Sequence, residues 1–541
     1  MSDGTFRVPT PVNEPVFGYA PGSPERESLA RTIDQMSKDR VDAPSVIDGE
    51  EVRTGDTFTV RAPHRHELEL ADVHAAGRPE MERAVAAATA AQREWAATPF
   101  EQRAAIFLRV ADLLATTWRD RINAATILGQ SKSVLQAEID AACELIDFLR
   151  FNVAFAEKIY AEQPGNVTGE WNRVDYRPLE GFVLAITPFN FTAIAGNLPT
   201  APAIMGNTVV WKPSEKQALA AHYTMQLFRA AGLPDGVINL VHGDGALAAD
   251  VGTSSPDMAA LHFTGSAQIL SSLWRTIGER VDTYRSFPRI VGESGGKDFV
   301  LAHPSADVDR MIVGLARGAF EYQGQKCSAA SRAYIPRSLW PQVRDGLADV
   351  SSQLTMGDVG ADLSTFMGAV IDGNAFRKHA DAIERARSEG AEVLVGGDPD
   401  DSEGWFVPPT VLVTDDPRSH TMTTELFGPI LTVNVYDDAN WEQMLPEVDQ
   451  ATQYALTGAV FADDRAAVIQ ATEALRNSAG NFYVNDRPTG SVVGRQPFGG
   501  ARRSGTNDKA GSMLNMTRWV SPRAIKETSA APLDWRYPHQ G

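Results

Sequence analysis

The sequence of 541 residues has little cysteine, no long hydrophobic run and a deficit of basic residues. Its only two cysteines, Cys143 and Cys327, exclude a disulfide framework and suit a reducing compartment. The 50 Lys and Arg residues stand against 69 Asp and Glu residues, giving a formal charge of −19 that would repel nucleic-acid phosphates and anionic lipid. We therefore expect a small-molecule substrate, with no nucleic-acid or membrane partner.

Membrane-spanning helices and targeting segments are also not indicated. No window approaches the roughly 20 uninterrupted apolar residues that a membrane helix needs. An apolar segment, residues 181–205, is interrupted by three prolines and is predicted to belong to the core. The N-terminal segment contains acidic residues and lacks a basic region followed by an apolar run, which argues against a transit peptide. The expected location is the cytoplasm.

The chain is long enough for two to four domains, and its Gly, Pro and Asp residues are spread evenly as in an α/β enzyme. The first forty residues are predicted to form a loosely folded arm. Helical spacing of apolar residues predicts long amphipathic helices over residues 79–118 and 133–160. The tail from Gly505 is predicted to be an arm that packs on another part of the structure.

Strand-like and helical segments then alternate along the chain. Strands are predicted over residues 181–188, 207–214 and 237–245, and a further strand ends at Ser266. The helices between them make βαβ units, which indicate a parallel sheet with ligands at the carboxyl ends of its strands. A second α/β region is predicted from about Val300 to Asn485.

Cys327 stands among small residues in the segment GQKCSAASR. A lone cysteine is most often a buried structural thiol. Small neighbours would nevertheless leave space for a substrate, and a helix start or a cation such as Lys326 would lower the thiol pKa. Taken alone, this segment leaves both interpretations open.

Four further segments offer groups that suit catalysis by a thiol or binding of a nucleotide. Glu293 precedes paired glycines in ESGGK and would serve as a base that activates water, although a solvated surface Glu is the plainer interpretation. Asn190 lies in an apolar run, where its side-chain NH₂ would donate to an oxyanion or merely cap a turn. In WKPSE and FTGS, the strand-end residues Lys212, Glu215, Gly265 and Ser266 would hold a ribose and a pyrophosphate, yet neither string is a GxGxxG motif.

Seven strings in this order, TPFNF, WKPSE, FTGS, ESGGK, GQKCS, ELFGP and QPFGGARRSG, resemble the aldehyde dehydrogenase superfamily over roughly residues 60–520. The resemblance implies that Cys327 is the nucleophile, Glu293 the base for deacylation, and Asn190 with the Cys327 backbone N–H the oxyanion donors. It implies NAD as cofactor, bound by Thr187, Lys212, Glu215, Gly265, Ser266, Glu425 and Phe427. Two departures, Ser294 for the common Leu and Phe189 for the common Trp, remove no catalytic atom.

Within the superfamily, long strings such as AACELIDFLRFN, EYQGQKCSA and VNDRPTGSVVGRQPFGGARRSGTNDKAG are most similar to the 1-pyrroline-5-carboxylate dehydrogenase family over nearly the whole chain. That resemblance implies oxidation of L-glutamate γ-semialdehyde to L-glutamate. It implies that the substrate carboxylate binds Ser328 and the loop of Thr489, Gly490 and Ser491. It further implies that Phe191, Phe498 and Glu144 face the substrate; a plain turn is the alternative for the loop.

The resemblance also implies the architecture, an α/β aldehyde dehydrogenase fold with a Rossmann-like cofactor domain, an α/β catalytic domain and a small β oligomerisation flap. The expected boundaries are 1–155 and 179–299 for the NAD-binding domain, 300–504 for the catalytic domain, and 156–178 with 505–541 for the flap and C-terminal arm. An exposed two-stranded extension needs a partner edge, so we expect at least a homodimer. No metal is expected.

Two other functions stay open at this point. One is an NAD-dependent dehydrogenase for another carboxylated aldehyde, such as succinate semialdehyde. The other is a catalytically silent binding protein on the same fold, against which the joint presence of Cys327, Glu293 and Asn190 argues. For NAD against NADP, Glu215 favours NAD, because a carboxylate at the adenine ribose would repel a 2′-phosphate.

Overall fold

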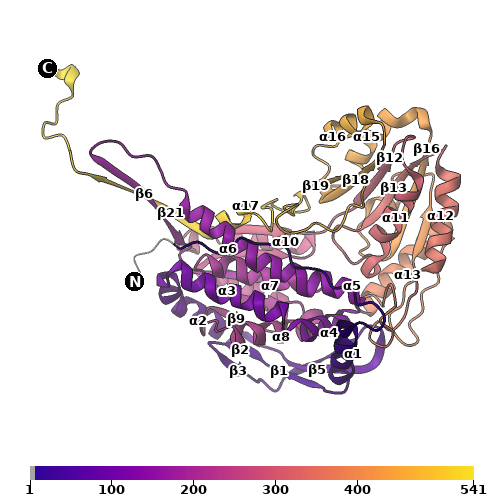
Figure 1. Ribbon diagram of the computed structural model, residues 1–541, viewed down its shortest axis with the longest axis horizontal. Coiled ribbons are helices and arrows are strands. Elements are labelled where there is room, and N and C mark those ends of the chain that lie inside the picture. Colours follow the sequence, from indigo (N-terminus) through magenta and orange to yellow (C-terminus); the bar gives the residue numbers. More distant parts are fainter. Residues whose placement is uncertain (1–5) are drawn as a thin grey trace.

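The computed structural model describes residues 6–541, in which two large sheets form two halves of the molecule (Figure 1). Residues 1–5, the start of the acidic N-terminal segment, lie outside the described residues. The first sheet has seven strands in the order β11 (Arg289–Glu293), β10 (Met258–Thr264), β7 (Phe182–Thr187), β8 (Thr208–Pro213), β9 (Ile238–Leu240), β2 (Ser45–Ile47) and β3 (Glu50–Val52). The five strands from β11 to β9 are parallel, which confirms the predicted parallel sheet.

Helices cover both faces of this sheet because its strands are apolar on both sides. Alternate residues of β7 point in opposite directions, so Phe182 and Leu184 join one hydrophobic core while Val183 and Ala185 join another. The first core is closed by α2 (Arg78–Ala97), α9 (Gly245–Ser254) and α10 (Ala267–Glu279). The second is closed by α3 (Phe100–Ala115), α6 (Leu145–Ala161), α7 (Thr192–Ile204) and α8 (Ala218–Ala230), with α4 (Arg119–Gln130) beside them.

The second half of the molecule is another doubly covered sheet. Its seven strands follow the order β14 (Glu392–Val395), β15 (Thr410–Val413), β16 (Ile430–Tyr436), β13 (Ala330–Pro336), β12 (Asp298–Ala302), β18 (Thr457–Phe461) and β19 (Asn481–Val484). Only the edge strand β14 is antiparallel to its neighbour. The helices of this half are α11 (Val308–Phe320), α12 (Trp340–Gln353), α13 (Gly373–Ser388), α14 (His420–Thr423), α15 (Trp441–Gln450) and α16 (Arg465–Ala474).

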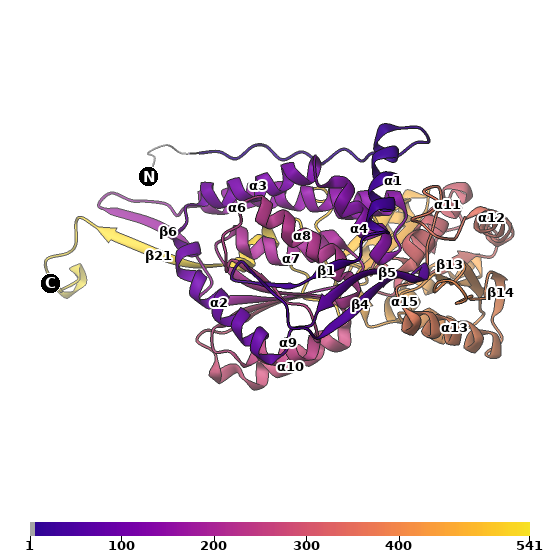
Figure 2. The same cartoon turned by 90° about the horizontal axis from the view of Figure 1, so that it is seen from below.

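Smaller elements complete the chain. A three-stranded sheet has the order β1 (Val41–Ala43), β5 (Arg65–His74), β4 (Thr57–Ala62), and β17 (Tyr454–Ala455) pairs with β20 (Ala501–Arg502). The strands β6 (Glu170–Pro178) and β21 (Val520–Thr528) form an antiparallel pair that projects from the body (Figures 1 and 2). The short helices are α17 (Met513–Met516) and the 3-10 turns η2 (Glu215–Gln217), η3 (Val281–Thr283), η4 (Glu321–Gly324), η5 (Asp438–Asn440), η6 (Thr517–Trp519) and η7 (Pro538–Gln540).

Three expectations about local structure were wrong in part. The predicted helix over residues 79–118 is two helices, because the chain turns at Thr98 and Pro99. The predicted helix over residues 133–160 is divided into α5 (Val134–Ala137), the π-helix η1 (Glu138–Glu144) and α6, since the turns of η1 are wider than an α-helix allows. The described part of the first forty residues is not loosely folded, because helix α1 (Pro24–Met36) buries Leu29, Ile33 and Met36.

The apolar segment 181–205 is core, as predicted. It forms β7 and α7, and nearly all residues of α7 are buried even though Pro199 and Pro202 lie inside the helix. Across residues 6–541, no helix is both long and apolar enough to cross a bilayer.

Candidate active site

The two halves of the molecule bring Cys327 and Glu293 together. Cys327 lies between η4 and β13 in the second half, and Glu293 is the last residue of β11 in the first. The Cys327 Sγ is 3.9 Å from the Glu293 Oε1. Asn190 follows β7, is buried, and donates from Nδ2 to the Gln325 carbonyl oxygen at 3.0 Å, two residues before the thiol. Three side chains from separate segments thus converge on one point.

Burial sets the protonation states of the thiol and the carboxyl group. It raises the pKa of Glu293 to about 7, a shift that the Cys327 hydrogen bond and the charge of Lys509 only partly oppose. Burial, reinforced by Glu293, also raises the pKa of Cys327 well above its usual value. At neutral pH the thiol therefore keeps its proton until a neighbouring base removes it, and Glu293 is the base in contact with it.

The expectation that a neighbouring cation or a helix start lowers the thiol pKa was wrong. Lys326 turns away from Cys327 and pairs with Glu321, with Nζ and Oε2 3.0 Å apart. The thiol is also preceded by the 3-10 turn η4, which ends at Gly324, and is not at the start of a longer helix. Activation of the thiol accordingly depends on Glu293.

A cavity of about 290 Å³ reaches the thiol. Its wall includes Cys327 and Glu293 together with the residues that the sequence assigned to the substrate, namely Glu144, Phe191, Ser328, Thr489, Gly490, Ser491 and Phe498. Cavities of this size accept small organic molecules. The sequence-predicted catalytic and substrate residues, apart from Asn190, therefore share one enclosed space.

One end of this cavity is lined by the side chains of Ser328, Thr489 and Ser491, which carry hydroxyl groups, and by Gly490. The Ser328 and Thr489 hydroxyl oxygens are 2.7 Å apart, which ties the loop of residues 488–496 to the segment that carries the thiol. Gly490 has φ +99°, a conformation that side chains disfavour, so glycine is needed for this turn. Hydroxyl and N–H donors aimed into one space suit an anionic group.

The cavity wall also contains charged groups that the sequence argument did not assign. Lys326 and Arg487 line it, and both face Glu321. Lys509 lines it near Glu293 and donates from Nζ to the carbonyl oxygens of Gly480 and Gly499, at 2.7 and 3.0 Å, beside Phe498. Lys509 belongs to the string TNDKAG. This string had already been matched to the family, so a charged residue within it could have been predicted to line the site.

The two aromatic candidates and Glu144 come from different elements. Phe191 precedes α7, and the Lys132 Nζ lies 4.1 Å from the centre of its ring. Phe498 is held by reciprocal backbone hydrogen bonds with Ala510. Glu144 is the last residue of η1, and burial, with the charge of Asp140, raises its pKa well above the usual value. A cationic group on a ligand would be drawn to this carboxyl group.

The nucleotide candidates lie along one edge of the first sheet. The parallel strands β10, β7 and β8 are neighbours, and their carboxyl ends carry Gly265 and Ser266, Thr187, and Lys212. The Ser266 hydroxyl accepts from the Ile269 N–H and so caps α10, leaving the positive end of that helix facing the edge. Glu215 begins the turn η2 directly after β8. This edge is where nucleotides bind in open α/β sheets.

The other two nucleotide candidates, Glu425 and Phe427, belong to the second half and precede β16. The Glu425 Oε1 accepts from the Gly296 N–H at 3.0 Å, and burial raises the Glu425 pKa. Phe427 has φ +61°, and its ring packs edge-on against that of Phe189 with centroids 5.8 Å apart. Glu425 is therefore tied to the glycine pair that follows Glu293.

The donor set at this edge fits a dinucleotide. Lys212 is 6% exposed, and within the described residues its ammonium has neither a hydrogen bond nor an ion pair. A Cβ on Gly245 would come within 3.4 Å of that ammonium, so glycine keeps the space around it open. Because this ammonium is accessible and unpaired among the described residues, it is available to donate to a ribose hydroxyl. No group of three or more His, Cys, Asp or Glu side chains in the described chain is placed to hold a metal ion.

Comparison with known proteins identifies the class to which this fold and site belong. A model of the aldehyde dehydrogenase family matches residues 51–522. The chain belongs to the aldehyde dehydrogenase family.

Several full-length relatives are named as pyrroline-5-carboxylate dehydrogenases. The chain is 48% identical over 539 residues, covering 98% of both chains, to the probable delta-1-pyrroline-5-carboxylate dehydrogenase of Schizosaccharomyces pombe. It is 48% identical to the mitochondrial delta-1-pyrroline-5-carboxylate dehydrogenase of Mus musculus, covering 97% of this chain and 94% of the other. A crystal structure of the Mycobacterium tuberculosis delta-pyrroline-5-carboxylate dehydrogenase bound with NAD is 57% identical, with a TM-score of 0.96 and full coverage of both chains.

Proposed function

We propose that this chain oxidises L-glutamate γ-semialdehyde, the open form of 1-pyrroline-5-carboxylate, to L-glutamate with reduction of NAD, as the second step of proline catabolism. The observation that carries the proposal is the single cavity that joins the Cys327–Glu293 pair to the hydroxyl-lined loop at Gly490. A substrate with an aldehyde at one end and a carboxylate at the other matches both ends of this cavity. Full-length relatives named for this activity support the assignment.

Cys327 is the nucleophile and Glu293 its base. Glu293 takes the thiol proton, and the sulfur adds to the aldehyde carbon, giving a thiohemiacetal. The negative charge that develops on the aldehyde oxygen is met by the Cys327 backbone N–H and by Asn190. An amide NH₂ has two hydrogens, and the Asn190 group spends one on Gln325, so the other is free for the oxyanion.

NAD, when bound, supplies the hydride acceptor that converts the thiohemiacetal to a thioester. Glu293 releases the thiol proton to solvent before deacylation and then takes a proton from water, whose oxygen attacks the thioester carbon. The carbon–sulfur bond breaks, glutamate leaves, and the proton returns to the thiol. A carboxyl group with a pKa of about 7 is suited to accept a proton in both stages.

The substrate is held at its charged end and along its chain. Ser328, Gly490 and Ser491 bind the α-carboxylate through hydroxyl and backbone N–H groups, while Phe191 and Phe498 flank the aliphatic chain. Glu144 faces the α-amino group, since an ammonium offsets the cost of ionising this buried carboxyl group.

The edge of the first sheet would hold the cofactor. Its adenosine and pyrophosphate side would be held by Thr187, Lys212, Glu215, Gly265 and Ser266, and its nicotinamide-ribose side by Glu425 and Phe427. Glu215 favours NAD over NADP through repulsion of a 2′-phosphate.

For the domain division and the assembly we propose the arrangement expected from the sequence. Residues 1–155 and 179–299 form the NAD-binding domain, 300–504 the catalytic domain, and 156–178 with 505–541 the flap and arm. The projecting β6–β21 pair leaves strand edges that favour pairing with a second copy, hence a homodimer or larger homo-oligomer. Two free cysteines fit a reducing location such as the cytoplasm.

The test is NADH formation with 1-pyrroline-5-carboxylate, succinate semialdehyde and propanal under matched conditions. We expect the highest kcat/KM with 1-pyrroline-5-carboxylate. A clear preference for succinate semialdehyde would assign the cavity to a substrate without the α-amino group. Binding of NAD with no turnover of any aldehyde would instead indicate a silent binding protein.

A further inference from the structure

An extended segment at the N-terminus, residues 7–23, lies along the helical face of the first half and is here termed the arm (Figure 2). Its backbone is fixed to α6 at two places. The Val8 N–H donates to the Glu157 carboxylate at 3.1 Å, and the Glu14 N–H donates to the Asp147 carboxylate at 2.7 Å. The arm therefore follows a defined path although it contains no helix or strand before α1.

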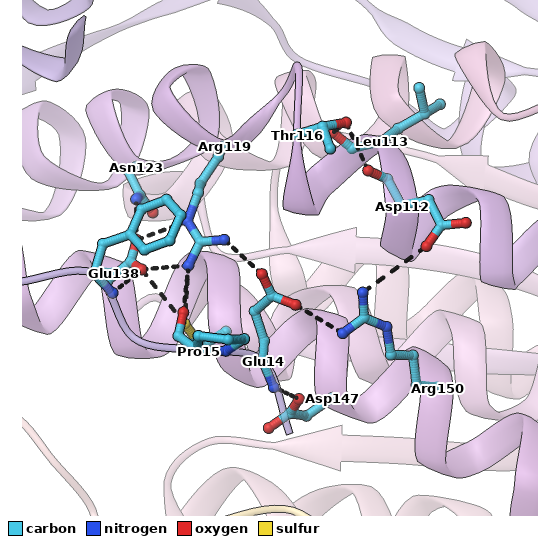
Figure 3. A network of polar contacts seen from close by, with 12 residues as sticks. Glu14, Pro15, Asp112, Leu113, Thr116, Arg119, Asn123, Glu138, Asp147 and Arg150 are labelled. Carbon is cyan, nitrogen blue, oxygen red and sulfur yellow. Dashed lines mark hydrogen bonds and ion pairs between the residues drawn. The ribbon is translucent and has the colours of Figure 1, made fainter. Parts of the chain in front are cut away.

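Glu14 fastens the arm by two ion pairs (Figure 3). Its Oε1 is 2.7 Å from an Arg119 guanidinium nitrogen, and its Oε2 is 2.7 Å from one of Arg150. Only 10% of the Glu14 side chain is exposed, so solvent screens these pairs weakly. They hold the arm between α4 and α6.

Asn13, next to Glu14, connects the arm to both sides of the cavity mouth. Its Nδ2 donates to the Asp147 Oδ2 at 2.8 Å and to the Val493 carbonyl oxygen at 2.9 Å. The Arg495 Nε donates to its Oδ1 at 3.1 Å. Asn13 thus bridges α6 and the 488–496 loop, two residues beyond Ser491.

The 488–496 loop is supported in part by its own Val493, whose buried side chain packs in the hydrophobic core of the first half. It contains no helix or strand, and both Gly490 and Gly494 adopt positive φ. Its own internal bonds run between Val492, Arg495 and Gln496, while the Ser328–Thr489 contact holds its other end. Val16 of the arm lines the same cavity as Gly490 and Ser491. The arm is therefore both a wall of the cavity and a fastening for its loop.

We propose that Asn13 is a positioning residue for the substrate, holding the 488–496 loop so that Gly490 and Ser491 face the charged end of the aldehyde. This inference rests on the proposed function of the same cavity. Asn13 touches no reacting atom and lies on the loop's outer side, so it acts on how the carboxylate-bearing substrate binds. Aldehydes without a carboxylate do not use this loop and do not depend on Asn13.

The experiment compares Asn13→Ala with the full-length wild-type chain on 1-pyrroline-5-carboxylate and on propanal, both with saturating NAD. With two hydrogen bonds to the loop lost, we expect kcat/KM for 1-pyrroline-5-carboxylate to fall roughly tenfold, mostly through KM, and that for propanal to stay within about twofold. Asn13→Asp keeps the size and the contact with Arg495 but loses the donor and sets a carboxylate against Asp147 and the Val493 carbonyl oxygen, so its selective loss should be at least as large. Val12→Ala, at a neighbouring position that is 69% exposed, is the matched control and should behave as wild type.

Each outcome bears on the inference. An equal loss with both aldehydes in the two Asn13 variants, or no loss at all, would overturn it, since the first indicates a general structural role and the second none. Thermal unfolding of each variant shows whether an equal loss comes from misfolding. A wild-type chain that does not prefer 1-pyrroline-5-carboxylate over propanal would refute the proposed function, which is a result distinct from failure of the Asn13 variants.

Discussion

Two buried carboxylates, Glu138 and Glu293, have opposite surroundings. Glu138 accepts from Arg119, Asn123, Tyr19 and the Phe17 N–H, and despite burial these bonds lower its pKa. Glu293 has only the Cys327 thiol in hydrogen-bond contact, and burial raises its pKa to about 7. The first carboxylate is permanently charged and structural, whereas the second is left poorly solvated and is free to exchange a proton.

The largest effect is expected when the Cys327 thiol, which contacts Glu293, is removed. Cys327→Ala should reduce NADH formation from 1-pyrroline-5-carboxylate by more than roughly 10,000-fold, because the described cavity wall holds no second thiol to form the thiohemiacetal. The variant should still bind NAD, which can be measured by the quenching of protein fluorescence. Turnover near the wild-type rate would exclude a covalent route through this thiol.

Replacing Glu293 itself should be nearly as damaging to activity. Glu293→Gln keeps the shape but cannot accept a proton, so kcat should fall about 100- to 10,000-fold. Steady-state assays and alkylation of Cys327 by iodoacetamide would measure this, and alkylation should slow in the variant. If alkylation and kcat are both unchanged, Glu293 is not the base.

Glu138→Gln should leave the rate of aldehyde oxidation unchanged but lower the free energy of unfolding. It removes one of the two carboxylates that pair with the Arg119 guanidinium and leaves Glu14 as the other, which costs about 1–3 kcal/mol in the free energy of unfolding. Urea unfolding monitored by circular dichroism gives the value. As a control, Glu392→Gln breaks an exposed ion pair with Arg344 and should lower the free energy of unfolding by less than about 1 kcal/mol. Equal losses in the two variants would mean that the buried ion pair of Glu138 stabilises the fold no more than an exposed one does.

The smallest effect is the response to pH. The deprotonated Glu293 is the active form, so kcat/KM should rise about tenfold per unit of pH up to about 7 and then level off. A carboxyl group whose folded-state pKa is raised destabilises the fold as pH rises from its unfolded value of 4.5 toward 7. Glu293→Gln should thus raise the melting temperature at pH 8 and leave it nearly unchanged at pH 4.5. A rate profile that is flat between pH 5.5 and 7 would contradict the raised pKa.

Much of the architecture could be predicted because its signals are local. Apolar strands separated by helices gave β7, β8 and β10 close to their observed bounds, and short family strings pointed to Cys327 and Glu293, which the structure places in contact. These strings also pointed to the loop at Gly490. Local pattern and family strings together therefore identified both the sheets and the shared cavity.

The remainder depends on contacts between residues far apart in the sequence. Asn13 donates hydrogen bonds to Asp147, 134 residues away in the sequence, and to Val493, 480 residues away. The spacing of apolar residues along the chain does not predict contacts of this kind. The thiol pKa depends on burial by both halves, so the sequence neighbour Lys326 was a misleading guide. The π-helix turns of η1 lie within a helical pattern of apolar residues, which gives no sign of them.

The two reacting side chains belong to different sheets, and this ties chemistry to the mutual docking of the halves. Cys327 precedes a strand of one sheet and Glu293 ends a strand of the other, so their separation of 3.9 Å measures how the halves sit together. A slight loosening of that junction would open the proton-transfer distance while each sheet stays intact. Catalysis should consequently disappear at lower denaturant concentrations than secondary structure does, making turnover the most sensitive gauge of the junction.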